Sequence, residues 1–164
     1  MKFATALMAA VLVAGLGTGG ARAASSDDQD FVTTAQSDLL GQYALAALAR
    51  NKASDANAKA LAKQIATNAD AANMWLKKYA AAHNISLPNK PTIRASAQYG
   101  SLQGTSGSSF DKQFVQDINV DTQMQVSDFQ DAASSASDPE LKSFAKQQVT
   151  ALQKFTTAAT KLSH

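Results

Sequence analysis

Apolar residues recur at the three- and four-residue spacing of an α-helix in four stretches of this chain. No stretch alternates apolar and polar residues with the period of a β-strand. The pattern predicts an all-α fold with four helices, roughly over residues 28–51, 54–83, 108–134 and 137–162. The inward stripes contain Phe31, Ala35, Leu39, Gln42, Tyr43, Ala46 and Ala49, then Ala58, Leu61, Ala62, Ile65, Ala69, Ala72, Leu76 and Tyr79, then Phe110, Phe114, Ile118, Thr122, Val126 and Phe129, and finally Leu141, Phe144, Ala145, Gln148, Leu152, Phe155, Ala159 and Leu162.

Two of the predicted helices begin at recognisable start signals. Ser26 with Gln29 three residues later resembles a capping box, in which each side chain bonds to a free backbone N–H. The run Ser137-Asp138-Pro139-Glu140 combines a capping side chain with an early proline and an acid. We therefore expect sharp helix starts at both places.

The segment between the second and third helices, 84–107, is long and rich in helix-breaking residues. It holds Pro88 and Pro91 and three glycines, so we predict a linker with one short helical turn near Ala95–Leu102. A helix over 54–83 is about 45 Å long, whereas the linker reaches about 80 Å when extended. The linker can therefore run the length of a bundle and start the third helix parallel to the second and beside it. This order predicts a ferritin-like four-helix bundle with one long crossover between helices 2 and 3.

The first 23 residues are typical of a secretory signal peptide. Lys2 gives a positive start, 4–16 is an apolar run, and Ala21-Arg22-Ala23 is a small-x-small cleavage site. The run is shorter than the roughly 20 apolar residues that span a bilayer. We predict a signal peptide over 1–23, one domain over 24–164, no membrane span, and a periplasmic or secreted protein.

Cleavage of this leader changes the charge of the chain. The full sequence has 15 Lys+Arg and 13 Asp+Glu. Lys2 and Arg22 leave with the leader, whereas every acid lies at Asp27 or later, so the mature chain carries 13 charges of each sign. This balance predicts no nucleic-acid partner. The chain has no cysteine, so neither a disulfide nor a lipid anchor on cysteine is expected.

Residues that support metal or catalytic chemistry are scarce. Glu140 is the only glutamate and is already explained as a helix-start residue, while His83 and His164 stand at the ends of predicted helices. A ferritin-like di-metal site requires several inward glutamates and Glu-x-x-His motifs, which this chain lacks. It also lacks a cysteine nucleophile, a Gly-x-Ser-x-Gly motif and a lysine-containing phosphate loop. The sequence therefore predicts no metal, no cofactor and no enzyme.

Several polar residues nevertheless lie on or beside the inward stripes. One interpretation is a functional polar site at the centre of the bundle. The other is a set of internally hydrogen-bonded groups that fix the register of the helices, and it is the one we favour. The residues concerned are Gln42, Asn68, Asp121, Thr122 and Gln148.

Trp75 stands at the edge of the second helix's stripe, close to Tyr79. A boundary ring packed against the core is the simpler interpretation. An exposed Trp75 beside Tyr79 would instead be a contact point for a partner. The lysines on the same helix are expected to form a solvated face rather than a lipid- or nucleic-acid-binding patch; they are Lys59, Lys63, Lys77 and Lys78.

Short motifs in a fixed order give the chain a resemblance to a known family. Residues 28–162 resemble the secreted, ferritin-like bacterial family DUF4142, also described as predicted outer-membrane protein. The motifs that carry this resemblance are Asp30-Phe31-Val32, Leu48-Ala49, Lys59-Ala60-Leu61-Ala62, Asn73, Leu76, Ile85-Ser86-Leu87-Pro88, Phe110-Asp111, Phe129 and Asp138-Pro139-Glu140-Leu141-Lys142-Ser143-Phe144-Ala145.

The resemblance implies a location in the bacterial envelope but no metal site. Members of the family commonly carry a Glu in the first helix and one His in each later helix. The corresponding positions here are Gln42, Ala69, Thr122 and Phe155, so all four are substituted. We expect a non-catalytic protein with an interaction or stress-protective role, binding an unknown envelope protein or a small apolar ligand. The alternatives are a metal-binding protein that uses an atypical site around Gln42, Thr122 and Gln148, or a relic of such a protein.

Overall fold

The computed structural model describes residues 24–163, and within this range every regular element is a helix. The predicted all-α class is therefore confirmed. The predicted signal peptide, 1–23, lies outside the described residues. No helix among the described residues is long and apolar enough to cross a membrane. The helices are α1 (Ser26–Lys52), α2 (Ala56–His83), α3 (Ile93–Gln103), α4 (Gly107–Ser135) and α5 (Pro139–Leu162).

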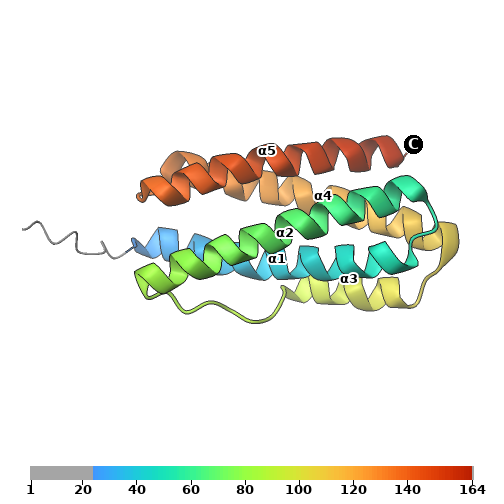
Figure 1. Ribbon diagram of the computed structural model, residues 1–164, viewed down its shortest axis with the longest axis horizontal. Coiled ribbons are helices and arrows are strands. Elements are labelled where there is room, and N and C mark those ends of the chain that lie inside the picture. The colour runs from blue at the N-terminus through green and yellow to red at the C-terminus, as the bar shows by residue number, and fades with distance from the viewer. Residues whose placement is uncertain (1–23, 164) are drawn as a thin grey trace, which may run out of the picture.

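The four long helices form two antiparallel hairpins that pack side by side (Figure 1). α1 and α2 form the first hairpin and α4 and α5 the second. Across the hairpins, α1 packs against α4 and α2 packs against α5. α4 runs parallel to α2, as the long crossover predicts, but its close neighbours are α1 and α5. The expectation that the third long helix lies beside the second is therefore wrong, because antiparallel neighbours surround each helix and the parallel pair is diagonal.

The crossover contains more helix than its glycines and prolines suggest. Residues 84–92 are non-helical, and α3 then extends over three turns instead of the single turn expected. The Thr92 hydroxyl accepts a hydrogen bond from the Ala95 backbone N–H at 3.2 Å, which caps the helix. Ala95 and Leu102 are buried against the bundle. This tertiary burial outweighs the poor helix propensity of Gly100.

The helix starts follow the expected chemistry with small shifts in position. Ser25 caps α1 by accepting a bond from the Asp28 backbone N–H at 3.1 Å, so the capping residue lies one position before the predicted Ser26. Asp138 caps α5 and Pro139 occupies its first turn, which confirms the predicted start signal. α2 is capped in the same way by Asp55.

Aromatic and aliphatic side chains fill the core between the hairpins. Phe110, Phe114 and Phe129 are at most 1% exposed. The predicted stripes lie mostly inside, with one clear exception: Tyr43 is 41% exposed. Tyr43 directly follows the inward Gln42, so it lies about 100° further around the helix. It lines a surface groove instead.

Candidate functional site

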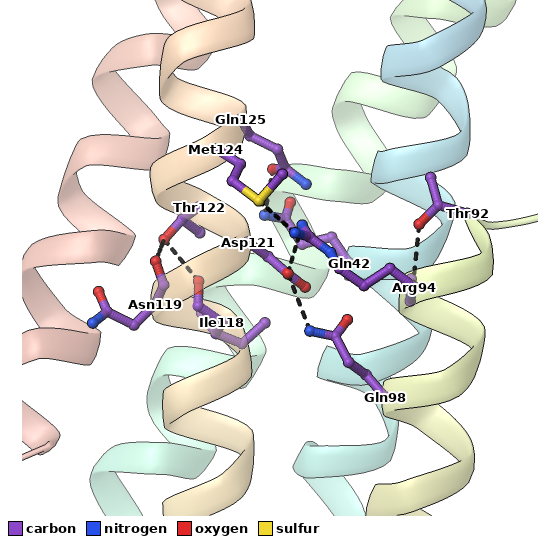
Figure 2. Close-up of polar contacts among 11 residues, drawn as sticks. Gln42, Thr92, Arg94, Gln98, Ile118, Asn119, Asp121, Thr122, Met124 and Gln125 are labelled. Atoms are coloured by element: carbon purple, nitrogen blue, oxygen red, sulfur yellow. Dashed lines mark hydrogen bonds and ion pairs between the residues drawn. The ribbon is translucent and has the colours of Figure 1, made fainter.

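A pair of glutamine side chains joins α1 to α4 at the centre of the bundle. The Gln42 amide donates a hydrogen bond to Gln125 Oε1 at 2.9 Å, and both residues are at most 4% exposed. The carbonyl oxygen of Gln42 is buried without a hydrogen-bond partner. Figure 2 shows this pair next to Asp121. Gln42 is therefore an interior residue, as predicted, and bonds a residue outside the predicted set.

Three further predicted residues link α5 to its neighbours. The Asn68 amide donates to Gln148 Oε1 at 2.9 Å, which links α2 to α5. Thr122 donates to the Ile118 carbonyl at 2.8 Å and accepts a bond from the Thr156 hydroxyl at 2.9 Å, which links α4 to α5. These contacts are the internal hydrogen bonds expected of register-fixing groups.

Asp121 lies beside the glutamine pair, but its carboxylate bonds residues of α3. Its carboxylate forms an ion pair with Arg94 at 2.8 Å and accepts a hydrogen bond from Gln98 at 3.1 Å (Figure 2). Arg94 also contacts the Met124 sulfur. Of the five predicted residues, Asn68 and Gln148 bond to each other, whereas Gln42, Asp121 and Thr122 bond residues outside the set. The set therefore forms separate contacts between helices.

An acidic group around Asp121 was not predicted from the sequence. Burial raises the pKa of Asp38 to about 6, and the nearby Asp128 adds to this rise. Burial likewise raises the pKa of Asp117 to about 6, with a further contribution from Asp121. The pKa values of Asp121 and Asp128 are also raised, first by burial. Arg94 is the basic side chain that opposes all four shifts.

These raised pKa values predict that the protein is more stable at mildly acidic pH. Between the ordinary value of 3.8 and about 6, folded Asp38 and Asp117 bind protons that the unfolded chain does not. The free energy of unfolding therefore falls as the pH rises from about 4 to 6 and stays low at pH 7. After allowance for solvent screening, Asp38→Asn and Asp117→Asn should each raise the free energy of unfolding at pH 7 by about 1 kcal/mol.

Urea unfolding at pH 5 and pH 7 measures this effect. The wild type should be more stable at pH 5, and the double variant should lose most of that difference. Asp70→Asn, on the exposed side of α2, is the matched control and should leave the difference intact. A wild type that gains stability between pH 5 and 7 would contradict the prediction.

Trp75 and Tyr79 pack into the bundle and do not form an exposed pair. The Trp75 ring stacks on Phe144 with centroids 4.0 Å apart and on Tyr79 at 5.1 Å. Tyr79 is only 3% exposed, and burial raises the pKa of its hydroxyl. The hypothesis of a partner contact formed by both rings is corrected accordingly, because stacking across α2 and α5 leaves Tyr79 inaccessible.

Two aspartates hold the turns of the opposite hairpins in a reciprocal arrangement. Asp28, in the first turn of α1, accepts bonds from the backbone N–H groups of Ser137 and Asp138 at 3.0 and 3.2 Å. Asp111, in the second turn of α4, accepts the corresponding bonds from Ser54 and Asp55 at 3.0 and 2.9 Å. Each hairpin thus fixes the turn of the other.

This reciprocity reflects an internal repeat with an offset of 83 residues, the difference between Asp28 and Asp111. The same offset relates Gln42 to Gln125, which meet at the centre. It also relates the whole runs Ala53-Ser54-Asp55 and Ala62-Lys63-Gln64 to Ala136-Ser137-Asp138 and Ala145-Lys146-Gln147. The α1–α2 and α4–α5 hairpins are therefore related by an approximate two-fold axis near the Gln42–Gln125 pair. A search for self-similarity would have found this signal in the sequence.

Several hollows lie on the surface beside α1. A groove of about 540 Å³ between α1 and α3 is lined by Gly41, Tyr43, Leu48, Pro91 and Tyr99, among others. A smaller hollow of about 300 Å³ between α1 and α4 is lined by Phe31 and several aspartates. Within residues 24–163, no group of three or more His, Cys, Asp or Glu side chains is arranged to hold a metal ion.

The chain was compared with known protein sequences, solved structures and protein families. A comparison with curated protein sequences gives no match. Among solved structures, the chain is similar to one described as "Crystal structure of DUF305 fragment from Deinococcus radiodurans", with a TM-score of 0.77 and 15% sequence identity, over 87% of this chain and 98% of that chain. At this identity the likeness concerns the fold alone. The sequence profile of the family described as "Domain of unknown function (DUF4142)" matches residues 15–162, and the chain therefore belongs to the DUF4142 family.

Proposed function

We propose that this protein is an exported, non-catalytic helical bundle of the bacterial envelope that acts by binding a partner on its surface. Its relation to ferritin-like proteins is part of the proposal: two antiparallel hairpins and a crossover that runs the length of the bundle support it. The signal-peptide pattern of residues 1–23 supports export.

The chemistry of four interior positions carries the proposal. Gln42, Ala69, Thr122 and Phe155, which correspond to the family's usual Glu and His positions, are at most 6% exposed. They present an amide, a methyl group, a hydroxyl and a phenyl ring to the interior. Gln42 and Thr122 are also engaged in hydrogen bonds between helices. Such groups fill and fix a core, whereas di-metal sites in bundles use inward carboxylates and imidazoles.

Binding then depends on the outer surface of the molecule. The interior is filled by rings and methyl groups, and the two hollows described above are both open to the surface. The α1–α3 groove, with its two tyrosines, is the feature that suits a small apolar ligand. The α1–α4 hollow combines apolar and acidic groups and suits a protein partner.

Purification of the protein from envelope fractions tests both parts of the proposal. Mass spectrometry is expected to find a chain that begins at Ala24, and Leu12→Arg, within the apolar run, should retain the precursor in the cytoplasm. Elemental analysis of the native chain should find only trace metal. An intact 1–164 chain confined to the cytosol would contradict export, and stoichiometric iron, manganese or zinc would favour the metal-binding alternative.

A further inference from the structure

The groove between α1 and α4 has two halves, and α3 occupies one of them. In that half the Lys52 ammonium donates to the backbone carbonyls of Leu102 and Gln103 at 3.3 and 2.8 Å. Gln113 donates to the Ser101 hydroxyl at 2.7 Å. Arg94 pairs with Asp121 near the centre of the groove. In Figure 1, α3 lies along the C-terminal half of α1.

The 83-residue repeat maps this occupied half onto the hollow between α1 and α4. The residues that contact α3, Lys52 and Gln113, correspond to Ser135 and Asp30, and both of these line the hollow. Phe114 corresponds to Phe31, which also lines it. The hollow is therefore the two-fold equivalent of the α3 site, and it continues an interface that the protein already uses. We refer to it as the open half-groove.

The open half-groove differs in charge from the half that α3 occupies. It is lined by Asp27, Asp30, Asp128 and Asp131, with Asp28 engaged by the α4–α5 turn. Asp38, the equivalent of Asp121, stands one helical turn beyond the lining residue Thr34. The occupied half contains Lys52 and the arginine of α3, whereas no lysine or arginine lines the open one. Arg94 is the cation whose charge reaches Asp38 and Asp128, and it is already paired with Asp121.

The two halves also differ in depth. α3 approaches α1 closely at Gly41, where any Cβ atom would clash with the Cβ of Ala95. The equivalent residue on α4 is Met124, whose side chain is 50% exposed. A second helix therefore cannot approach the open half-groove as closely as α3 approaches its own site. An occupant must lie further out and extend long side chains toward a floor that includes Phe31 and Ala132.

We propose that the open half-groove is a docking site for a basic segment of a partner protein, whose Lys or Arg side chains pair with Asp30 and Asp131 and lay their aliphatic stems on Phe31. Long cationic side chains combine reach, charge complementarity and an apolar stem. This inference rests on the proposed surface-binding function and specifies the chemistry of the partner.

Fluorescence anisotropy with a defined peptide tests the proposal. The probe is a fluorescein-labelled peptide of three Lys-Leu-Lys-Lys repeats, and the same peptide with Glu in place of Lys is the control. The mature protein should bind the lysine peptide, more weakly as salt is added, and should not bind the glutamate peptide. In NMR spectra of the labelled protein, the shifted amide signals should cluster on the first turns of α1 and the last turns of α4.

Substitutions of exposed residues locate the site without disturbing the core. Asp30→Asn with Asp131→Asn should weaken binding by about tenfold, the effect of losing two surface ion pairs. Ser135→Lys, which recreates the position of Lys52, should weaken it to a similar degree by placing a cation in the groove. The matched control, Asp70→Asn with Glu140→Gln, removes the same charge from exposed positions elsewhere and should leave binding unchanged.

The outcomes separate this inference from the proposed function. Absence of binding, equal weakening by the control pair, or NMR shifts centred on α2 and α5 would each overturn the docking site. An exported protein with only trace metal would still satisfy the proposed function in all three cases. Conversely, stoichiometric metal in the native protein would overturn the proposed function whatever the peptide does.

Discussion

Replacing Asp111 with alanine is expected to lower the free energy of unfolding by about 3 kcal/mol, because it leaves two backbone N–H groups of the α1–α2 turn without their charged acceptor. The carboxylate also accepts a hydrogen bond from the Ser54 hydroxyl at 2.5 Å, and Asp111 is 9% exposed. Burial raises the pKa of Asp111, but the bonds from Ser54 and Asp55 and the charge of Lys59 outweigh it, so the pKa lies below the ordinary 3.8. Its contribution is therefore present above pH 3.8 and is lost as the pH falls through the folded-state value.

Urea unfolding at pH 7 measures the loss. Asp111→Asn keeps the shape of the side chain but loses its charge, and should retain only part of the stability. Asp28→Ala, at the equivalent position of the repeat, should cost a similar amount, because it removes the acceptor for Ser137 and Asp138. Asp70→Ala is the exposed control, with an expected effect within about 0.5 kcal/mol. If Asp111→Ala were no worse than this control, the turns would not depend on these carboxylates.

Replacing Gly41 with leucine should destabilise the protein by about 3 kcal/mol through overpacking, because the new side chain has to enter the space filled by α3. A Cβ atom at this position already clashes with the Cβ of Ala95. We expect α3 to move away from α1 and to weaken the pairing of Arg94 with Asp121. Hydrogen exchange of the α3 amides should accelerate more than that of α2 or α5.

A rescue experiment distinguishes this clash from other effects of the substitution. Gly41→Ala should be destabilising despite a gain in helix propensity of about 1 kcal/mol. Adding Ala95→Gly removes the atom with which it clashes and should restore the protection of α3 from exchange. The control is Gly100→Leu on α3, where nothing lies within 4 Å of the added Cβ, and which should not destabilise the protein. Equal effects at Gly41 and Gly100 would contradict the close approach of α3 to α1.

The long elements could be predicted from the sequence because their apolar periodicity is strong and their start signals are local. Asp138 with Pro139 determines the start of α5 within its own turn. The predicted cap of α1, Ser26, lies one residue too late, because Ser25 and Ser26 are adjacent capping residues and the local pattern does not choose between them. The full length of α3 could not be predicted, because the burial of Ala95 and Leu102 depends on contacts with helices distant in the sequence.

The candidate site shows the same division between local and long-range information. Spacing placed Gln42, Thr122 and Gln148 on inward faces, and each is buried. Their hydrogen-bond partners could not be predicted, because these partners depend on how the two hairpins align. Gln42 meets Gln125 because both residues lie beside the two-fold axis. The acidic surroundings of Arg94 were missed for the same reason. Asp38, Asp121 and Asp128 become neighbours only after α1 and α4 pack together.

The reciprocal bonds of Asp28 and Asp111 join two similar hairpins within one chain. In a symmetric dimer, contacts of this kind form between two molecules. Each hairpin offers the other the surface that an identical subunit would offer in a symmetric dimer. Because residues 84–106 join the hairpins covalently, their encounter is intramolecular, at an effective concentration that does not change with the amount of protein. Dilution therefore cannot separate the two halves, although it would separate the subunits of a weak dimer.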